Sequence, residues 1–180
     1  MTIETIKQKG EQLKAALATI ESNRKLWQDE KKGLLKTTLE QIKSELGFDM
    51  QVQSLTYTTN SEGINLTFNN GYSGIYEKTK TSMKSYAKHG GYIVFSQAYN
   101  GKVFVIIGYP YIEGIVTQGD AIAVGKFNPE EITADFIYKQ VSFFLDEMIK
   151  WEIDTSVDSQ EDEARANSVG FVFGKTPPSQ

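Results

Sequence analysis

Four lysines stand close together in the middle of the chain, with no acidic residue between them. They are Lys78, Lys80, Lys84 and Lys88. Two of them, Lys84 and Lys88, are four residues apart and would share one face of a helix. Such a group of cations is suited to an anionic ligand or an acidic partner segment. It is also the composition of a solvated basic face, and it could receive the acidic C-terminal segment of the same chain.

Aromatic and acidic side chains surround a glycine-containing connection at residues 111–127. They are Tyr109, Tyr111, Glu113 and Asp120. Rings and carboxylates beside such a loop can line a ligand pocket. Tyrosines on both sides of Pro110 are also typical of a loop that is anchored to the domain, and we favour this interpretation over the pocket.

Recognisable catalytic and metal-binding motifs are missing from the sequence. His89 is the one histidine, it lies beside Gly90, and the chain contains no cysteine. The sequence has no Gly-x-Ser-x-Gly elbow and no phosphate-binding Gly-x-x-x-x-Gly-Lys-Ser/Thr loop. We therefore predict no catalytic residue, no cofactor and no metal, although an enzyme that uses tyrosine and carboxylate side chains stays as a third hypothesis.

Composition narrows the class of protein further. The 180 residues carry 19 basic and 23 acidic side chains, a formal net charge of -4. This balance argues against a general nucleic-acid binder, which needs net positive charge. The longest purely apolar run, Val103 to Ile107, is far too short to span a bilayer, and the N-terminus shows no apolar signal core. We expect a cytoplasmic protein with no membrane or nucleic-acid partner.

A β-hairpin centred on Asn100 and Gly101 is the strongest structural signal. Two runs rich in β-branched and aromatic residues flank this dipeptide, which favours a two-residue type I′ turn. That turn would pair Phe95 with Ile106 and Gln97 with Phe104. Both faces of the hairpin would then be largely apolar, so we expect a central position in the sheet. One face would be covered by helix, and the other by a second helix, a partner chain or a ligand.

Residues 2–46 are predicted to be helical. An apolar stripe with alternating spacings of three and four passes along the first part, and it resumes out of phase at Leu35, which predicts a kink or break near Gly33. Gly47 is a suitable C-terminal residue for this helix. One small sheet cannot cover so long a stripe, so we expect that the helix either bends into a hairpin near Gly33 or packs on another chain. The narrow early stripe is typical of coiled-coil-like pairing. The early stripe consists of Ile3, Ile6, Leu13, Leu17, Ile20 and Trp27.

The remaining pattern completes an α+β domain. We expect an antiparallel sheet of about five strands, with three strands between residues 50 and 78, then a short helix over 82–88 and the hairpin. A C-terminal helix that begins at Asn128 and ends near Trp151 packs on this sheet. Residues 1–153 form a single domain with a helical extension at 1–46. An acidic, partly flexible tail follows at 154–180, and its apolar run 169–173 could add an edge strand.

This order of elements is similar to that of small, acidic, dimeric secretion chaperones, over roughly residues 35–151 and in element order alone. Our leading hypothesis is a non-enzymatic protein-binding or assembly module that acts as a homodimer and recognises another protein. The alternative is a small-molecule-binding sensor domain with a pocket between the sheet and residues 111–127. The surface expected to meet a ligand or partner comprises Lys78, Lys80, Lys84, Lys88, Tyr109, Tyr111 and Glu113.

Overall fold

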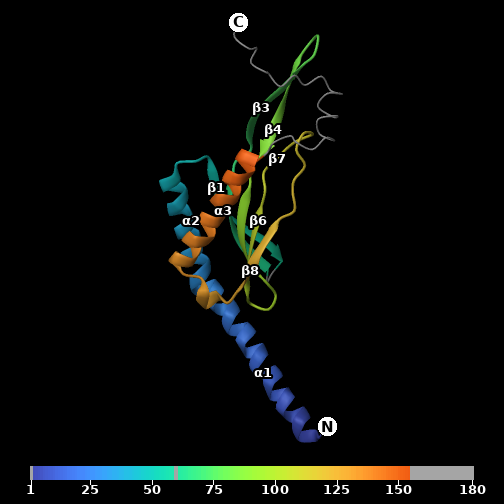
Figure 1. Cartoon of the computed structure of the whole chain (residues 1–180). Coiled ribbons are helices and arrows are strands. Elements are labelled where there is room, and N and C mark those ends of the chain that lie inside the picture. The colour runs from blue at the N-terminus through green and yellow to red at the C-terminus, as the bar shows by residue number, and fades with distance from the viewer. Residues whose placement is uncertain (1, 59–60, 155–180) are drawn as a thin grey trace.

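The computed structural model describes residues 2–58 and 61–154 and confirms the predicted α+β class. One long N-terminal helix leads into an antiparallel sheet, and a C-terminal helix returns to pack on that sheet. Helices α2 and α3 lie side by side on one side of the sheet, while the N-terminal part of helix α1 projects away from the domain (Figure 1). The acidic tail and its apolar run at 169–173 lie outside the described residues.

The N-terminal helix continues through the point where the sequence predicted a kink or break. It comprises helix α1 (Ile3–Leu26), a π-helical turn (Trp27–Lys31) and helix α2 (Lys32–Leu46). Within the π turn the N–H of Lys32 donates to the carbonyl of Trp27, five residues earlier. A π turn holds one residue more than an α turn. It therefore compensates for the one-residue shift in the apolar stripe, so that Trp27 and Leu35 are both fully buried.

Helix α2 ends as the sequence predicted. Gly47 takes the left-handed conformation at φ 65°, and its N–H donates to the carbonyl of Lys43 at 3.2 Å. Glycine adopts this conformation without the steric penalty of a side chain. The turn at Gly47 directs the chain into the first strand.

The main sheet has five antiparallel strands in the order β1-β2-β5-β6-β8. These are β1 (Met50–Thr58), β2 (Ser61–Phe68), β5 (Tyr92–Gln97), β6 (Val103–Gly108) and β8 (Ile122–Phe127). The helix-facing side of the sheet forms the core together with one face of α2 and α3. Its fully buried side chains include Leu39, Ile64, Leu66, Phe95, Val105, Ile107, Ile137 and Phe144.

The β5–β6 hairpin exists, but the predicted turn and register are wrong. Phe95 pairs with Val105 and Gln97 with Val103, one residue away from the predicted register. Within residues 2–58 and 61–154 only glycines have a positive φ, which excludes a type I′ turn at Asn100. Instead Gly101, at φ 77°, ends a three-residue loop in which its N–H donates to the carbonyl of Ala98 at 2.9 Å. Such a loop, a tight turn followed by a left-handed glycine, is the next commonest hairpin connection.

With the observed register, the two faces of this hairpin differ in how far their side chains are buried. The helix-facing side carries Ile93, Phe95, Val103, Val105 and Ile107, all fully buried. On the opposite side Phe104 and Ile106 are only half-buried. Both α2 and α3 lie on one side, and no helix among residues 2–58 and 61–154 packs on the other (Figure 1). The expected second cover of the sheet is therefore not supplied by a helix of the described chain.

A second, smaller sheet extends beyond the main one at the end opposite the N-terminus (Figure 1). Its order is β3-β4-β7, with β3 (Gly71–Lys78), β4 (Met83–His89) and β7 (Tyr111–Ile112). The predicted short helix over 82–88 is wrong, because these residues pair with β3 as strand β4. Pairing with a neighbouring strand overrides the weak helical preference of the segment.

Helix α3 (Ala134–Asp154) begins later than the sequence predicted. Asn128 instead precedes a short 3-10 turn (Pro129–Glu131), and its N–H donates to the side chain of Glu131 at 2.7 Å. The helix proper follows Thr133, whose hydroxyl accepts from the N–H of Phe136 at 3.2 Å. Threonine is a favoured capping residue at this position.

Candidate functional site

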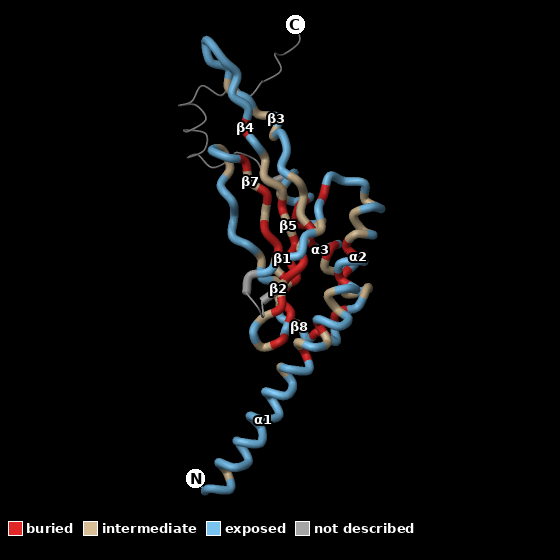
Figure 2. Tube along the Cα trace, turned by 180° about the vertical axis from the view of Figure 1, so that it is seen from behind, coloured by how far each residue is buried: buried red, intermediate tan, exposed pale blue. Residues whose placement is uncertain are grey.

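Helix α1 carries an apolar stripe that is exposed along its N-terminal part. Ile3, Ile6, Leu13 and Leu17 are 59%, 55%, 61% and 57% exposed. From Ile3 to Thr19 every residue except Thr5 is exposed, and Figure 2 shows this part of the helix as an isolated rod. We call Ile3, Ile6, Gly10, Leu13, Leu17 and Ile20 the α1 seam.

The α1 seam continues the face by which the same helix packs on its own domain. Further along the helix Ile20 is half-buried, Asn23 is 8% exposed and Trp27 is fully buried. The alternating spacing of four and three residues continues across this boundary from Ile20 through Arg24 to Trp27. The pattern is that of a packed helix, but the domain covers only its second half.

Polar contacts hold the covered half of the helix in place. Arg24 donates from its guanidinium to the carbonyl of Tyr99 in the β5–β6 loop. Beyond it, Lys32 and Gln28 both donate to Glu62 on β2, at 2.6 Å and 3.0 Å. The hydrogen bond from Lys32, followed by that from Gln28, lowers the pKa of the Glu62 carboxyl. The base of the projecting helix is therefore fixed, which fixes the direction of the α1 seam.

An apolar cavity of about 590 Å³ lies at the other end of the domain. It is formed where the start of β1, the β2–β3 and β4–β5 turns and the end of α3 converge. Glycine is required at positions 90 and 91. A Cβ on Gly90 would overlap Phe68, and a Cβ on Gly91 would overlap Met148. The apolar lining includes Phe48, Phe68, Pro110, Leu145, Met148 and Ile149. At its rim Lys88 and Glu152 form an ion pair.

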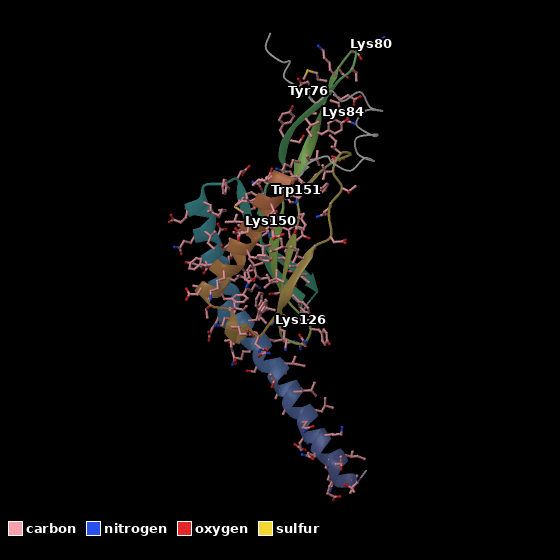
Figure 3. The ribbon with its side chains drawn as sticks, viewed as in Figure 1. Tyr76, Lys80, Lys84, Lys126, Lys150 and Trp151 are labelled. Atoms are coloured by element: carbon pink, nitrogen blue, oxygen red, sulfur yellow. The ribbon has the colours of Figure 1, made fainter. Side chains whose placement is uncertain are left out.

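The four lysines of the expected ligand surface lie on the β3–β4 hairpin, where Figure 3 labels Lys80 and Lys84, but they do not form one surface. Lys84 and Lys88 do share a face, because residues four apart also align along a strand. Lys84 lies 4.8 Å from the centroid of the Tyr86 ring, and Lys88 lies 4.8 Å from that of Trp151. Lys78 pairs with Met83 and so belongs to the opposite face. The cluster is thus divided between two faces of the hairpin.

The structure gives Tyr109, Tyr111 and Glu113 three separate environments. The hydroxyl of Tyr109 donates to Glu147 on α3 at 2.5 Å, while Tyr111 stacks on His89 with ring centroids 4.3 Å apart. The Glu113 side chain is exposed. None of the three lines the apolar cavity, although the adjacent Pro110 does. The contacts of the two tyrosines fit the anchoring interpretation.

The hydrogen bond between Tyr109 and Glu147 shifts the pKa of both side chains. Glu147 accepts from Lys150 at 2.5 Å as well as from Tyr109, and these two hydrogen bonds lower the pKa of its carboxyl. The same carboxylate, together with burial, raises the pKa of Tyr109 to about 12. Sequence reasoning missed Glu147, since an acid on the buried face of a helix gives no local sign of its partner.

No metal centre is evident in the described chain. Among residues 2–58 and 61–154, acidic and histidine side chains nowhere gather in a group of three that could hold an ion. None of the described helices has the length and apolar character needed to cross a membrane.

Comparisons with protein-family models, with curated proteins and with solved structures find no match to this chain. The function must therefore be argued from the surfaces of the molecule.

Proposed function

We propose that this protein is a non-enzymatic protein-binding or assembly module that acts as a homodimer through the α1 seam. The observation that carries the proposal is the set of four seam residues that are each more than half exposed. Burying a side chain of this size completely is worth about 1.5–3 kcal/mol, so each would recover about 1 kcal/mol in an interface.

Helix stability supports the same proposal. Most of the stability of helices in proteins comes from tertiary packing of an apolar face. Residues 3–19 of α1 lack such packing in the single chain, and Gly10 weakens this part of the helix by about 1 kcal/mol relative to alanine. Contact with a second α1 seam would stabilise the helix and cover the apolar stripe in one step.

The test is to place charge on the seam and, separately, on the opposite face. Leu13→Glu with Leu17→Glu puts two carboxylates on the seam, whereas Ala15→Glu with Ala18→Glu puts two on the outer face of the same turns. We expect the seam variant to be monomeric in light scattering after gel filtration and the control to remain dimeric. Two variants with the same mass as the wild type would contradict the proposal.

The apolar cavity favours a second candidate function, the binding of a small apolar molecule. Its volume of about 590 Å³ lies within the range of ligand sites, and its lining is mainly apolar with one ion pair at the rim. This site differs in position from the pocket expected beside residues 111–127.

A filling substitution tests this second candidate. Leu145→Trp should occupy the cavity, and Phe143→Trp adds the same ring to an exposed position on α3. The probe is 8-anilinonaphthalene-1-sulfonate, followed by fluorescence. The candidate predicts that Leu145→Trp lowers the probe affinity at least tenfold and that Phe143→Trp leaves it unchanged. Equal affinity in the two variants would rule out the cavity as the binding site.

A further inference from the structure

We propose that the two α1 seams pair in antiparallel orientation, with Ile3 of one copy beside Ile20 of the second copy. This inference rests on the proposed homodimer and adds the arrangement of its two chains. It follows from the position of the domain on the helix and from the position of Gly10 within the seam.

The domain itself obstructs the parallel alternative. Trp27 and Asn23 are buried by the same domain on the face that carries the seam. In a parallel pair the second helix would continue along this face past residue 20 and carry its own domain with it. It would meet the β5–β6 loop, where Gly101 lies against Asn23. A parallel pair would therefore have to splay apart before Trp27.

An antiparallel pair fits the free part of the helix. Residues 3–20 span about 27 Å at 1.5 Å per residue. If residues whose numbers sum to 23 lie opposite each other, the second helix begins beside Ile20, where the domain of the first chain starts to cover the seam. No seam residue is then left uncovered in either chain.

The position of Gly10 also favours the antiparallel over the parallel orientation of the two helices. A Cβ added at Gly10 would meet nothing within 4 Å in the single chain, so no contact within the domain requires glycine here. In a parallel pair Gly10 would face Gly10 of the second copy and leave a void in the middle of the interface. In the antiparallel pair each Gly10 faces a Leu13, and a small residue opposite a large one fills the layer.

The heptad pattern by itself does not favour a parallel dimer. Position a is occupied by Ile3, Gly10 and Leu17, and position d by Ile6, Leu13 and Ile20. Parallel dimers favour β-branched residues at a and leucine at d. Ile3 and Leu13 match this preference, whereas Leu17 and Ile20 reverse it, so the choice of orientation rests on the domain and on Gly10.

In the antiparallel pair the N-terminus of the second helix would meet the exposed Tyr99 side chain of the first chain. It is 78% exposed on the β5–β6 loop, and its backbone carbonyl is held by Arg24, one turn beyond Ile20. The N-terminal turn of the second chain would lie next to this ring, and Ile3 is the apolar residue that it brings.

Disulfide exchange tests the orientation directly, because the natural chain contains no cysteine. Ile6→Cys and Leu17→Cys chains are prepared separately, incubated alone and mixed in a glutathione buffer, and analysed on non-reducing gels. A Gln8→Cys chain on the outer face measures random collision. The antiparallel pair predicts a mixed disulfide between Ile6→Cys and Leu17→Cys chains, at least tenfold above either chain alone.

The outcomes separate this inference from the proposed function. Rapid bridging of Ile6→Cys chains with each other would overturn the antiparallel orientation and leave the homodimer standing. A monomer in light scattering, with bridging no faster than that of Gln8→Cys, would overturn both. Far-UV circular dichroism of each exposed-site variant confirms that the fold is unchanged.

Discussion

Gly101 lies against Asn23, and this contact marks the point where helix α1 leaves the domain. A Cβ built on Gly101 would lie 2.7 Å from the Asn23 Cβ and 2.9 Å from the carbonyl oxygen of Ile20. The left-handed conformation at φ 77° and the close approach of the helix both require glycine. The β5–β6 loop thus supports helix α1 at the point where the helix leaves the domain.

Replacing this glycine should therefore cost more than replacing a glycine with the same backbone strain. Gly74 has φ 82°, but a Cβ there would meet nothing within 4 Å. Alanine in the left-handed region costs about 1–2 kcal/mol at either site, and only Gly101→Ala adds the overlap with α1. Thermal unfolding should place Gly101→Ala several degrees below Gly74→Ala. Equal melting temperatures would mean that the loop does not support the helix.

The π turn predicts an unusual tolerance to deletion. Removing the exposed Asp29 would turn the π turn into an α turn, and Trp27 and Leu35 would stay on one face at the seven-residue spacing of a heptad. Removing Thr37, which is also exposed, offers no such compensation and would rotate Trp27 away from the face of Leu39. Thermal melts should show a small change for the first deletion and a large loss for the second. Similar losses would contradict our account of the stripe.

The Tyr109–Glu147 hydrogen bond predicts how stability depends on pH. The pKa of Glu147 is lowered in the folded state, so its contribution is present above the ordinary value near 4.5 and is lost as the pH falls through the folded value. The pKa of Tyr109 is raised to about 12, so its contribution is present below pH 10 and is lost as the pH rises from 10 to about 12.

Tyr109→Phe isolates this contribution. The substitution leaves the buried Glu147 with Lys150 as its remaining side-chain partner and should lower the free energy of unfolding by about 1–3 kcal/mol at pH 7. The difference from wild type should shrink between pH 10 and 12 in urea unfolding, and Tyr111→Phe serves as the control. A difference that stays constant over this range would show that the hydrogen bond does not set the pKa of Tyr109.

Strand and helix types could be predicted from the sequence wherever the residue pattern was strong, as in β1, β2 and α3. The hairpin register could not, because Asn100-Gly101 suits both a two-residue loop and a three-residue loop that ends in a left-handed glycine. Strand β4 was missed because the four-residue spacing of Lys84 and Lys88 places both on one side of either a helix or a strand. Pairing with β3 makes this segment a strand.

The α1 seam was visible in the sequence because it is a local, periodic pattern. The apolar cavity was not, since Phe48, Pro110 and Met148 come from three distant segments and meet only in the folded chain. The same reason explains why the predicted pocket residues Tyr109 and Tyr111 have separate partners in the structure.

The mass of the wild-type protein in solution tests the central claim most directly. Sedimentation equilibrium from about 1 to 100 μM should give a mass that rises toward twice the 20.2 kDa of the chain. Since burial of the seam must offset an association cost of about 4–15 kcal/mol, the dimer should depend on concentration. A mass of one chain throughout this range would contradict the α1 seam as a dimer interface.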